Sequence, residues 1–124
     1  FTGAALRQAV SDGLTDVVFV GMAGKLTKLA GGVLMTHYTK SKVDLSVLAA
    51  MSPTRLKPAV QQANTARHAY ELWEQAGVLR ECGDRLCTAV AEVLTRFSGL
   101  TARVAMVDPA GARCVAATEA SWVA

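Results

Sequence analysis

A chain of 124 residues is long enough to form one domain with its own hydrophobic core, without a disulfide or a metal to stabilise it. Hydrophobic residues make up 52% and charged residues 19%, a composition typical of folded globular proteins that excludes a disordered chain. The net charge is only +3, and no apolar stretch reaches the roughly 18 residues that span a bilayer, so we expect a cytoplasmic protein without a membrane segment.

The start of the chain has the pattern of a helix. Residues 2–12 carry apolar side chains at helical spacing, and Gly13 follows as a C-terminal cap. The chain begins at Phe1 inside this pattern, without the basic and apolar regions of a signal peptide, so we expect it to be a piece of a longer protein. Three cysteines without a CxxC spacing fit a reducing compartment and argue against a disulfide framework or a zinc site.

The most informative segment follows this helix. Residues 16–22 are β-branched and almost continuously apolar, which is typical of a strand covered on both faces, as in parallel sheets. Residues 24–35 return to helical spacing. A hydrophobic strand that leads through a glycine-rich turn into a helix is how α/β proteins build anion-binding sites. The helix has an apolar arc of Leu26, Leu29, Ala30, Val33 and Leu34 and a second arc of Lys25, Lys28 and Gly32.

Three more helices are predicted in the middle of the chain. Residues 44–51 fit a short helix capped by Asp44. A longer helix is expected over residues 58–76, ended by Gly77, and another over residues 79–97. The side chains expected to be buried on the two longer helices are Val60, Ala63, Ala66, Tyr70, Leu72, Trp73, Leu79, Cys82, Leu86, Val90, Val93, Leu94 and Phe97.

Two short strands are predicted near the end of the chain. They cover residues 103–107 and 113–118 and are joined by a turn at residues 108–111. Together with the earlier strand they indicate an α/β class: a layered, Rossmann-like αβα domain with a small, mainly parallel sheet and long helices. We expect residues 1–124 to be the single C-terminal domain of a two-domain protein, with further strands upstream of Phe1.

The positive charge is concentrated in one part of the chain. Residues 25–57 contain six basic residues and one acid, a net charge of +5, whereas the remainder, with seven basic and nine acidic residues, is −2. A local positive field predicts a negatively charged ligand at that place. The six basic residues are Lys25, Lys28, Lys40, Lys42, Arg55 and Lys57.

The glycines and lysines of this segment predict an anion site but match no nucleotide motif. The spacing from Gly21 to Gly24 is too short for GxxxxGK[ST], Leu26 stands where that motif has a hydroxyl, and GxGxxG also fails. Glycines let a backbone turn sharply and approach a ligand closely. Lys25 and Lys28 share a face near the helix N-terminus, where the helix dipole adds to their attraction for carboxylates or phosphates. The alternative is that the glycines serve packing and the lysines are solvated.

His37 follows the helix inside a polar run that includes Thr36. Because histidine titrates near neutrality, His37 is a candidate for moving a proton or for donating to a carboxylate. The alternative is a capping or surface residue. The basic residues lack interleaved aromatic side chains, so we expect no nucleic-acid surface.

The stretch FVGMAGKLTKLAGGVLMTHYTKSKVD resembles the signature of the CbiD-type cobalt-precorrin-5B (C-1)-methyltransferases. The shared pattern is a strand ending in glycine, a GK-L-K-L-A-G helix, a Thr-His pair and a later Asp. The positions that carry it are Gly21, Gly24, Lys25, Leu26, Lys28, Leu29, Ala30, Gly32, Thr36, His37 and Asp44.

The resemblance implies methyl transfer from S-adenosylmethionine to carbon 1 of cobalt-precorrin-5B, giving cobalt-precorrin-6A, in anaerobic cobalamin biosynthesis. The macrocycle carries the cobalt, so no protein metal site is expected. The substrate has many acetate and propionate groups, which Lys25 and Lys28 are expected to bind, with His37 donating to one of them or assisting a proton transfer. Members of the family are longer and have an N-terminal domain, so we expect the fragment alone to be inactive.

A different interpretation stays open on the residues alone. It is a non-catalytic α/β module that binds a polycarboxylate or phosphorylated ligand, or a partner domain. A homo-oligomer is compatible with either interpretation.

Overall fold

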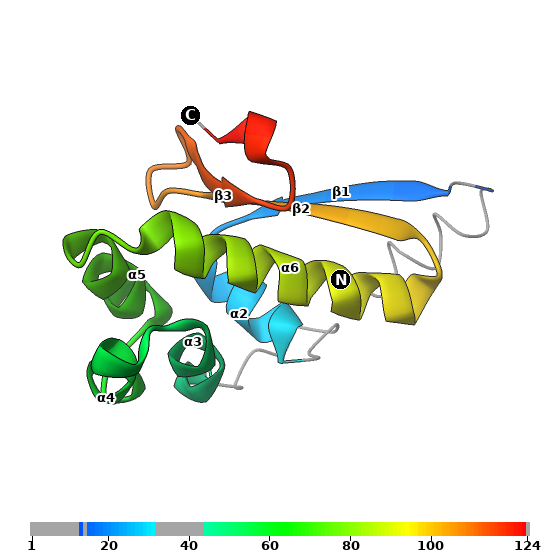
Figure 1. The fold of residues 1–124 in the computed structure, drawn as a ribbon. Coiled ribbons are helices and arrows are strands. Elements are labelled where there is room, and N and C mark those ends of the chain that lie inside the picture. Colours follow the sequence, from blue (N-terminus) through cyan, green and yellow to red (C-terminus); the bar gives the residue numbers. More distant parts are fainter. Residues whose placement is uncertain (1–12, 14, 32–43, 124) are drawn as a thin grey trace.

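The computed structural model describes residues 13, 15–31 and 44–123 (Figure 1). These residues form an α/β domain in which helices pack against a three-stranded sheet. In chain order the elements are β1 (Asp16–Gly21), α2 (Ala23–Ala30), α3 (Leu45–Met51), the 3-10 helix η1 (Thr54–Leu56), α4 (Lys57–Gln61), α5 (Ala66–Gln75), α6 (Leu79–Ser98), β2 (Thr101–Val107), β3 (Cys114–Ala117) and the 3-10 helix η2 (Ala120–Trp122).

The sheet is mixed, with the order β1-β2-β3. β1 pairs with β2 in parallel, from Asp16 opposite Thr101 to Gly21 opposite Met106, and β2 pairs with β3 antiparallel. The α/β class is confirmed, but the mainly parallel sheet is not: the six-residue connection after β2, which contains the turn at residues 108–111, is too short for the crossover that a parallel neighbour needs. That turn was predicted, and the Gly111 N–H donates to the Asp108 carbonyl across it (2.9 Å).

In the described part of the chain, the α-helices lie on one face of the sheet and the short η2 lies on the other (Figure 1). α6 packs along β2 and β3, and α2 fills the space between α6 and α5. Leu26 and Leu29 of α2 are fully buried, as their helical spacing predicts. On β1, Val17 and Phe19 pack against the core, whereas Val18 and Val20 on the opposite face are exposed. The prediction that β1 is covered on both faces is therefore wrong for the described residues.

The helix predicted over residues 58–76 is two helices, α4 and α5. The chain leaves the helix at Gln62 and starts again after Thr65, whose hydroxyl accepts from the His68 N–H (3.0 Å). Threonine competes for backbone hydrogen bonds and favours a helix start over a helix interior, which explains the break. Of the side chains expected inside the longer helices, Phe97 is wrong, because it is 40% exposed.

The helix predicted over residues 2–12 lies outside the described residues, as do residues 32–35 of the helix predicted over residues 24–35, but α2 itself ends at Ala30 with Gly31 as its C-cap. The predictions for α3 and α6 are confirmed within one residue at each end. Among the described helices, none has the combination of length and apolar character that crossing a bilayer requires.

A buried hydrogen-bond chain connects α5 to α3. The Trp73 indole N–H donates to Ser52 Oγ (2.8 Å), and the Ser52 hydroxyl donates to the Leu48 carbonyl (2.8 Å). Trp73 is fully buried and Ser52 nearly so, so no water is available to replace a lost partner. These two hydrogen bonds tie α5 to the end of α3.

Replacing Ser52 by alanine should lower the stability of the domain by about 1–3 kcal/mol, because the Trp73 N–H then stays buried without an acceptor. Denaturant unfolding followed by tryptophan fluorescence measures the change. Thr88→Ala on the exposed side of α6 is the control and should change stability by less than about 0.5 kcal/mol. Equal stability of the two variants would show that the hydrogen bonds through Ser52 do not stabilise the packing of α5.

Candidate functional site

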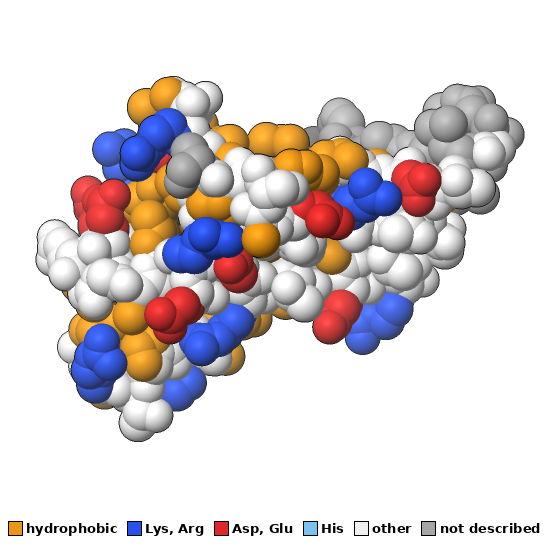
Figure 2. Space-filling model, turned by 45° about the horizontal axis from the view of Figure 1, so that its top comes forward, with side chains coloured by type: hydrophobic (Ala, Val, Ile, Leu, Met, Phe, Trp, Pro, Cys, Tyr) orange, Lys and Arg blue, Asp and Glu red, His pale blue; other side chains and the backbone are white. Residues whose placement is uncertain are grey.

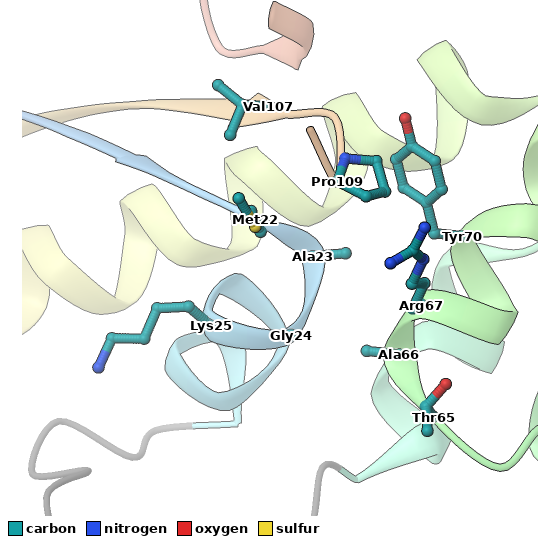
Figure 3. A pocket seen from close by; sticks show the side chains of 10 residues that line it. All are labelled: Met22, Ala23, Gly24, Lys25, Thr65, Ala66, Arg67, Tyr70, Val107 and Pro109. Atoms are coloured by element: carbon teal, nitrogen blue, oxygen red, sulfur yellow. The ribbon is translucent and has the colours of Figure 1, made fainter. Parts of the chain in front are cut away.

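A cavity of about 520 Å³ opens where β1 and β2 end and α2 and α5 begin (Figure 3). In α/β sheets, ligands bind at the carboxyl ends of the parallel strands, which is where this cavity lies. We call it the α2–α5 cavity. It is lined by Met22, Ala23, Gly24, Lys25, Thr65, Ala66, Arg67, Tyr70, Val107 and Pro109.

Two helix N-termini meet at the α2–α5 cavity. The first turn of α2 contributes Ala23, Gly24 and Lys25, and the first turn of α5 contributes Ala66 and Arg67. The N-terminal end of a helix carries the positive end of its dipole and attracts anions. Met22, at the N-cap of α2, makes no capping hydrogen bond through its side chain. Both helices therefore favour a negatively charged ligand in the space between them.

Two cationic side chains line the same cavity, and no carboxylate does so among its ten lining residues. Arg67 extends from α5 toward the first turn of α2, whereas the Lys25 side chain extends away from Arg67 (Figure 3). The two charges thus stand on different sides of the opening. This separation suits a ligand with several spaced negative groups better than a single small anion.

Burial and repulsion from Lys28 lower the pKa of Lys25 below its ordinary value. Both causes disfavour the ammonium form of Lys25. A bound anion beside Lys25 would favour that form and so counteract the lowering of its pKa. An anionic ligand should therefore bind with proton uptake when the pH is near the pKa of Lys25, and its affinity should fall as the pH rises through that range. A fall in affinity with rising pH is the direction expected when a protonated lysine binds an anion.

The remaining walls of the cavity are mainly apolar. Met22 and Val107 come from the ends of β1 and β2, and Pro109 comes from the turn between β2 and β3. Tyr70 stands next to Pro109 (Figure 3) and is 3% exposed, and burial raises the pKa of its hydroxyl. The cavity can therefore hold the apolar part of a ligand while cations bind its periphery.

The structure brings only part of the predicted site together. Gly24 and Lys25 line the α2–α5 cavity, and Gly21 ends β1 immediately before it. A Cβ at Gly21 would lie 3.1 Å from Phe19 Cε1, a tight contact that the Phe19 ring would have to relieve by a shift of a few tenths of an ångström. Lys28 lies one turn further along α2 and does not line the cavity.

The other predicted site residues lie elsewhere. Asp44 caps α3 by accepting from the Ser46 N–H (2.9 Å), as predicted, and hydrogen bonds from Ser46 lower the pKa of its carboxyl. Asp44 is not among the residues that line the cavity. Gly32, Thr36 and His37 lie outside the described residues.

Sequence reasoning missed Arg67, Thr65 and Pro109 and assigned Tyr70 to the core alone. Arg67 and Thr65 lie outside the positive window of residues 25–57. They come near Lys25 only because α5 packs against α2 in the folded chain, which the sequence alone does not indicate. A signal for them existed: Thr65 followed by an arginine in the first turn is a helix start with a cation beside it. It was hidden by the assumption of one continuous helix.

Part of the positive window has a structural role. The C-terminal carbonyls of α3 receive two cationic donors: Lys57 Nζ donates to the Ala49 carbonyl (3.0 Å), and Arg85 donates to the Met51 carbonyl (2.8 Å). Cations at a helix C-terminus stabilise its dipole. Lys57 is not among the residues that line the α2–α5 cavity, and Lys40 and Lys42 lie outside the described residues.

The cysteines do not supply a nucleophile to this site. Cys82 and Cys87 are fully buried on α6, and burial raises the pKa of Cys87 to about 12. A buried neutral thiol is unreactive. Within the described ranges, no group of three or more His, Cys, Asp or Glu side chains is arranged to hold a metal ion.

Comparison with known proteins identifies the family. The family model for the CbiD C-terminal domain matches residues 35–118. Curated relatives named cobalt-precorrin-5B C(1)-methyltransferase are 62% identical in Salinispora tropica and 59% identical in Salinispora arenicola, each over 95% of this chain. A relative with the same name in Rubrobacter xylanophilus is 47% identical over 98% of the chain. No solved structure gives a significant match.

The matched region is only a part of those relatives. It spans 33% of the two Salinispora proteins and 34% of the Rubrobacter protein. The family model covers residues 35–118, and the identity to the Salinispora tropica protein extends over 95% of the chain. The chain belongs to the CbiD family, and its residues 35–118 correspond to the C-terminal domain of that family.

Proposed function

We propose that this chain is the C-terminal domain of a cytoplasmic cobalt-precorrin-5B C(1)-methyltransferase. The full-length protein would transfer a methyl group from S-adenosylmethionine to C-1 of cobalt-precorrin-5B, giving cobalt-precorrin-6A, in anaerobic cobalamin biosynthesis. The observation that carries this proposal is the 62% identity over 95% of the chain to a protein of that name. The N-terminal domain of the full-length protein would be needed for turnover.

Within this enzyme, the α2–α5 cavity would bind carboxylate groups of the corrin substrate. Lys25 and Arg67 provide charge on different sides of the opening, and two helix N-termini add to the positive potential. Apolar walls from Met22, Val107 and Pro109 would contact the edge of the macrocycle. The cobalt would remain in the ring, without a ligand from this domain.

S-Adenosylmethionine fits the described part of this cavity poorly. It carries a sulfonium and an ammonium group against a single carboxylate, so its net charge is positive, while the lining carries Lys25 and Arg67 and no carboxylate. Two like charges in a partly buried space repel. We therefore do not assign the methyl donor to the α2–α5 cavity, and the N-terminal domain is the proposed place for it.

The proposed methyl transfer needs no nucleophilic side chain from this domain. Methyl transfer is an in-line displacement in which the sulfonium loses its charge. The protein then contributes by aligning the two substrates and excluding water. Lys25 and Arg67 would orient the ring, while Lys28 would add to the field from the next turn of α2. Gly21, Gly24, Gly32, Thr36 and Asp44 are proposed to shape the binding segment, and His37 to donate to a carboxylate or assist a proton transfer.

The test is an assay of the full-length protein with S-adenosylmethionine and cobalt-precorrin-5B, combined with thermal-shift measurements. The methyltransferase should form methylated product, and its melting temperature should rise with S-adenosylhomocysteine and separately with a corrinoid. Stabilisation by a corrinoid or another polycarboxylate alone, without product, would favour the non-catalytic binding module.

A further inference from the structure

An apolar strip runs along β1 on the sheet face opposite α6. Side chains alternate along a strand, so Val18 and Val20 share this face, and Met22 follows in the same alternation. Their exposed fractions are 53%, 58% and 46%. We call these three residues the β1 strip. Figure 2, with the top of the molecule turned forward, shows hydrophobic side chains along this upper surface.

The strip is confined to β1. Over β3 the same face carries η2, and Ala105 and Ala117 beneath it are buried (Figure 1). Between the covered and open parts, Arg103 pairs with Glu119 at 3.8 Å. The exposed apolar surface therefore ends at an ion pair on one side and at the sheet edge on the other, because β1 is an edge strand among the three described strands.

Such a surface is unusual for a strand of this type. Strands in parallel pairs are normally buried on both faces, and the sequence of β1, DVVFVG, has the continuous apolar pattern of a strand buried in that way. An exposed edge strand with β-branched side chains also invites unwanted pairing. The β1 strip therefore has the sequence of a buried surface, but the described residues leave it exposed.

We infer that the cover is the polypeptide that precedes this domain in the full-length protein. The curated relatives have about two thirds of their length outside the matched region, and the matched family model is that of the C-terminal domain. β1 is the first element of the described residues, so in sequence it is the strand nearest to that polypeptide. This inference rests on family membership and not on the proposed methyl transfer.

The size of the strip favours a covalently linked partner over a second copy of the chain. A stable dimer interface buries roughly 800 Å² on each partner, far more than three side chains provide. A segment of the same chain has a high effective concentration and needs little contact area. Because Met22 also lines the α2–α5 cavity, a segment on the strip would reach the mouth of that cavity.

Photo-crosslinking in the full-length protein identifies the occupant. p-Benzoylphenylalanine is placed at position 20, with position 88 on the exposed side of α6 as the matched control. After irradiation, the position-20 adduct should join peptides that precede residue 1, and the position-88 adduct should not. Adducts within residues 1–124, or between two copies, would overturn the inference.

Cysteine labelling supplies a second readout with a smaller side chain. V18C and V20C in the native full-length protein should react with iodoacetamide at least tenfold more slowly than T88C, and all three should react equally in denaturant. Reading each peptide by mass spectrometry separates them from the native cysteines. Native rates equal to that of T88C would show that the strip is open and the inference wrong.

Discussion

Under the proposed function, removing the positive charge of Lys25 or Arg67 is expected to weaken corrinoid binding by the full-length protein strongly and selectively. A charge-assisted hydrogen bond to a carboxylate contributes about 1.5–3 kcal/mol, so Lys25→Ala or Arg67→Ala should each raise KM for cobalt-precorrin-5B by about 10- to 100-fold. KM for S-adenosylmethionine should stay within about twofold, because the cationic α2–α5 cavity does not suit the methyl donor. Steady-state kinetics with each substrate varied in turn measures both constants.

Controls separate this effect from general charge and folding. Arg96→Ala removes an exposed arginine on α6, away from the cavity, and should change neither constant. Lys28→Ala should raise the corrinoid KM less than Lys25→Ala, since Lys28 acts only through its field. If Lys25→Ala and Arg67→Ala raised KM for S-adenosylmethionine and left the corrinoid KM unchanged, the cavity would belong to the methyl donor and the assignment would be wrong.

The second large effect concerns the packing of α6 on the sheet. Gly83 is buried in α6, and a Cβ there would lie 2.5 Å from the Ala116 Cβ on β3 and 2.8 Å from Met106 Cε on β2. Met106 could adjust its flexible end, but the Ala116 Cβ moves only with its strand. Gly83→Ala should therefore lower stability by about 1–3 kcal/mol through overpacking, despite the better helix propensity of alanine.

The matched control is another glycine inside a helix. A Cβ at Gly24 of α2 would have its nearest contact at 3.9 Å, from the Ala66 Cβ, which is ordinary van der Waals distance. Gly24→Ala should therefore leave stability unchanged or raise it by up to about 1 kcal/mol. Midpoints of denaturant unfolding, followed by the fluorescence of buried Trp73, compare the two. Equal midpoints would show that α6 has room to move away from β3.

The two predictions concern different properties of one arrangement. Gly83 lets α6 lie close to β2 and β3, while the short turn at Gly21 places α2 at the end of β1. With the sheet and α2 set in this way, α5 brings Arg67 to the α2–α5 cavity. The cavity therefore depends on close packing at positions that do not contact a ligand.

Local structure was largely predictable from the sequence. β1, α3, α6 and the turn at residues 108–111 were predicted because each has its own local signal: an apolar run, a capping aspartate, a long amphipathic period, a Pro-Gly turn. The family could also be named from the segment around Lys25, and the comparisons confirm it. These features depend on residues close together in the chain, so one sequence carries them.

The meeting of distant segments was decided only by the tertiary structure. Lys25 and Arg67 are far apart in sequence and line one cavity because α5 packs against α2, a contact that no local pattern encodes. Gly83 looks like a poor helix residue until β3 is seen 2.5 Å from its missing Cβ. The exposed valines of β1 are likewise predicted to be buried, and only the folded sheet shows that the described residues cover one of its two faces there. Short-range signals set the elements, and long-range packing sets which of their side chains share a site.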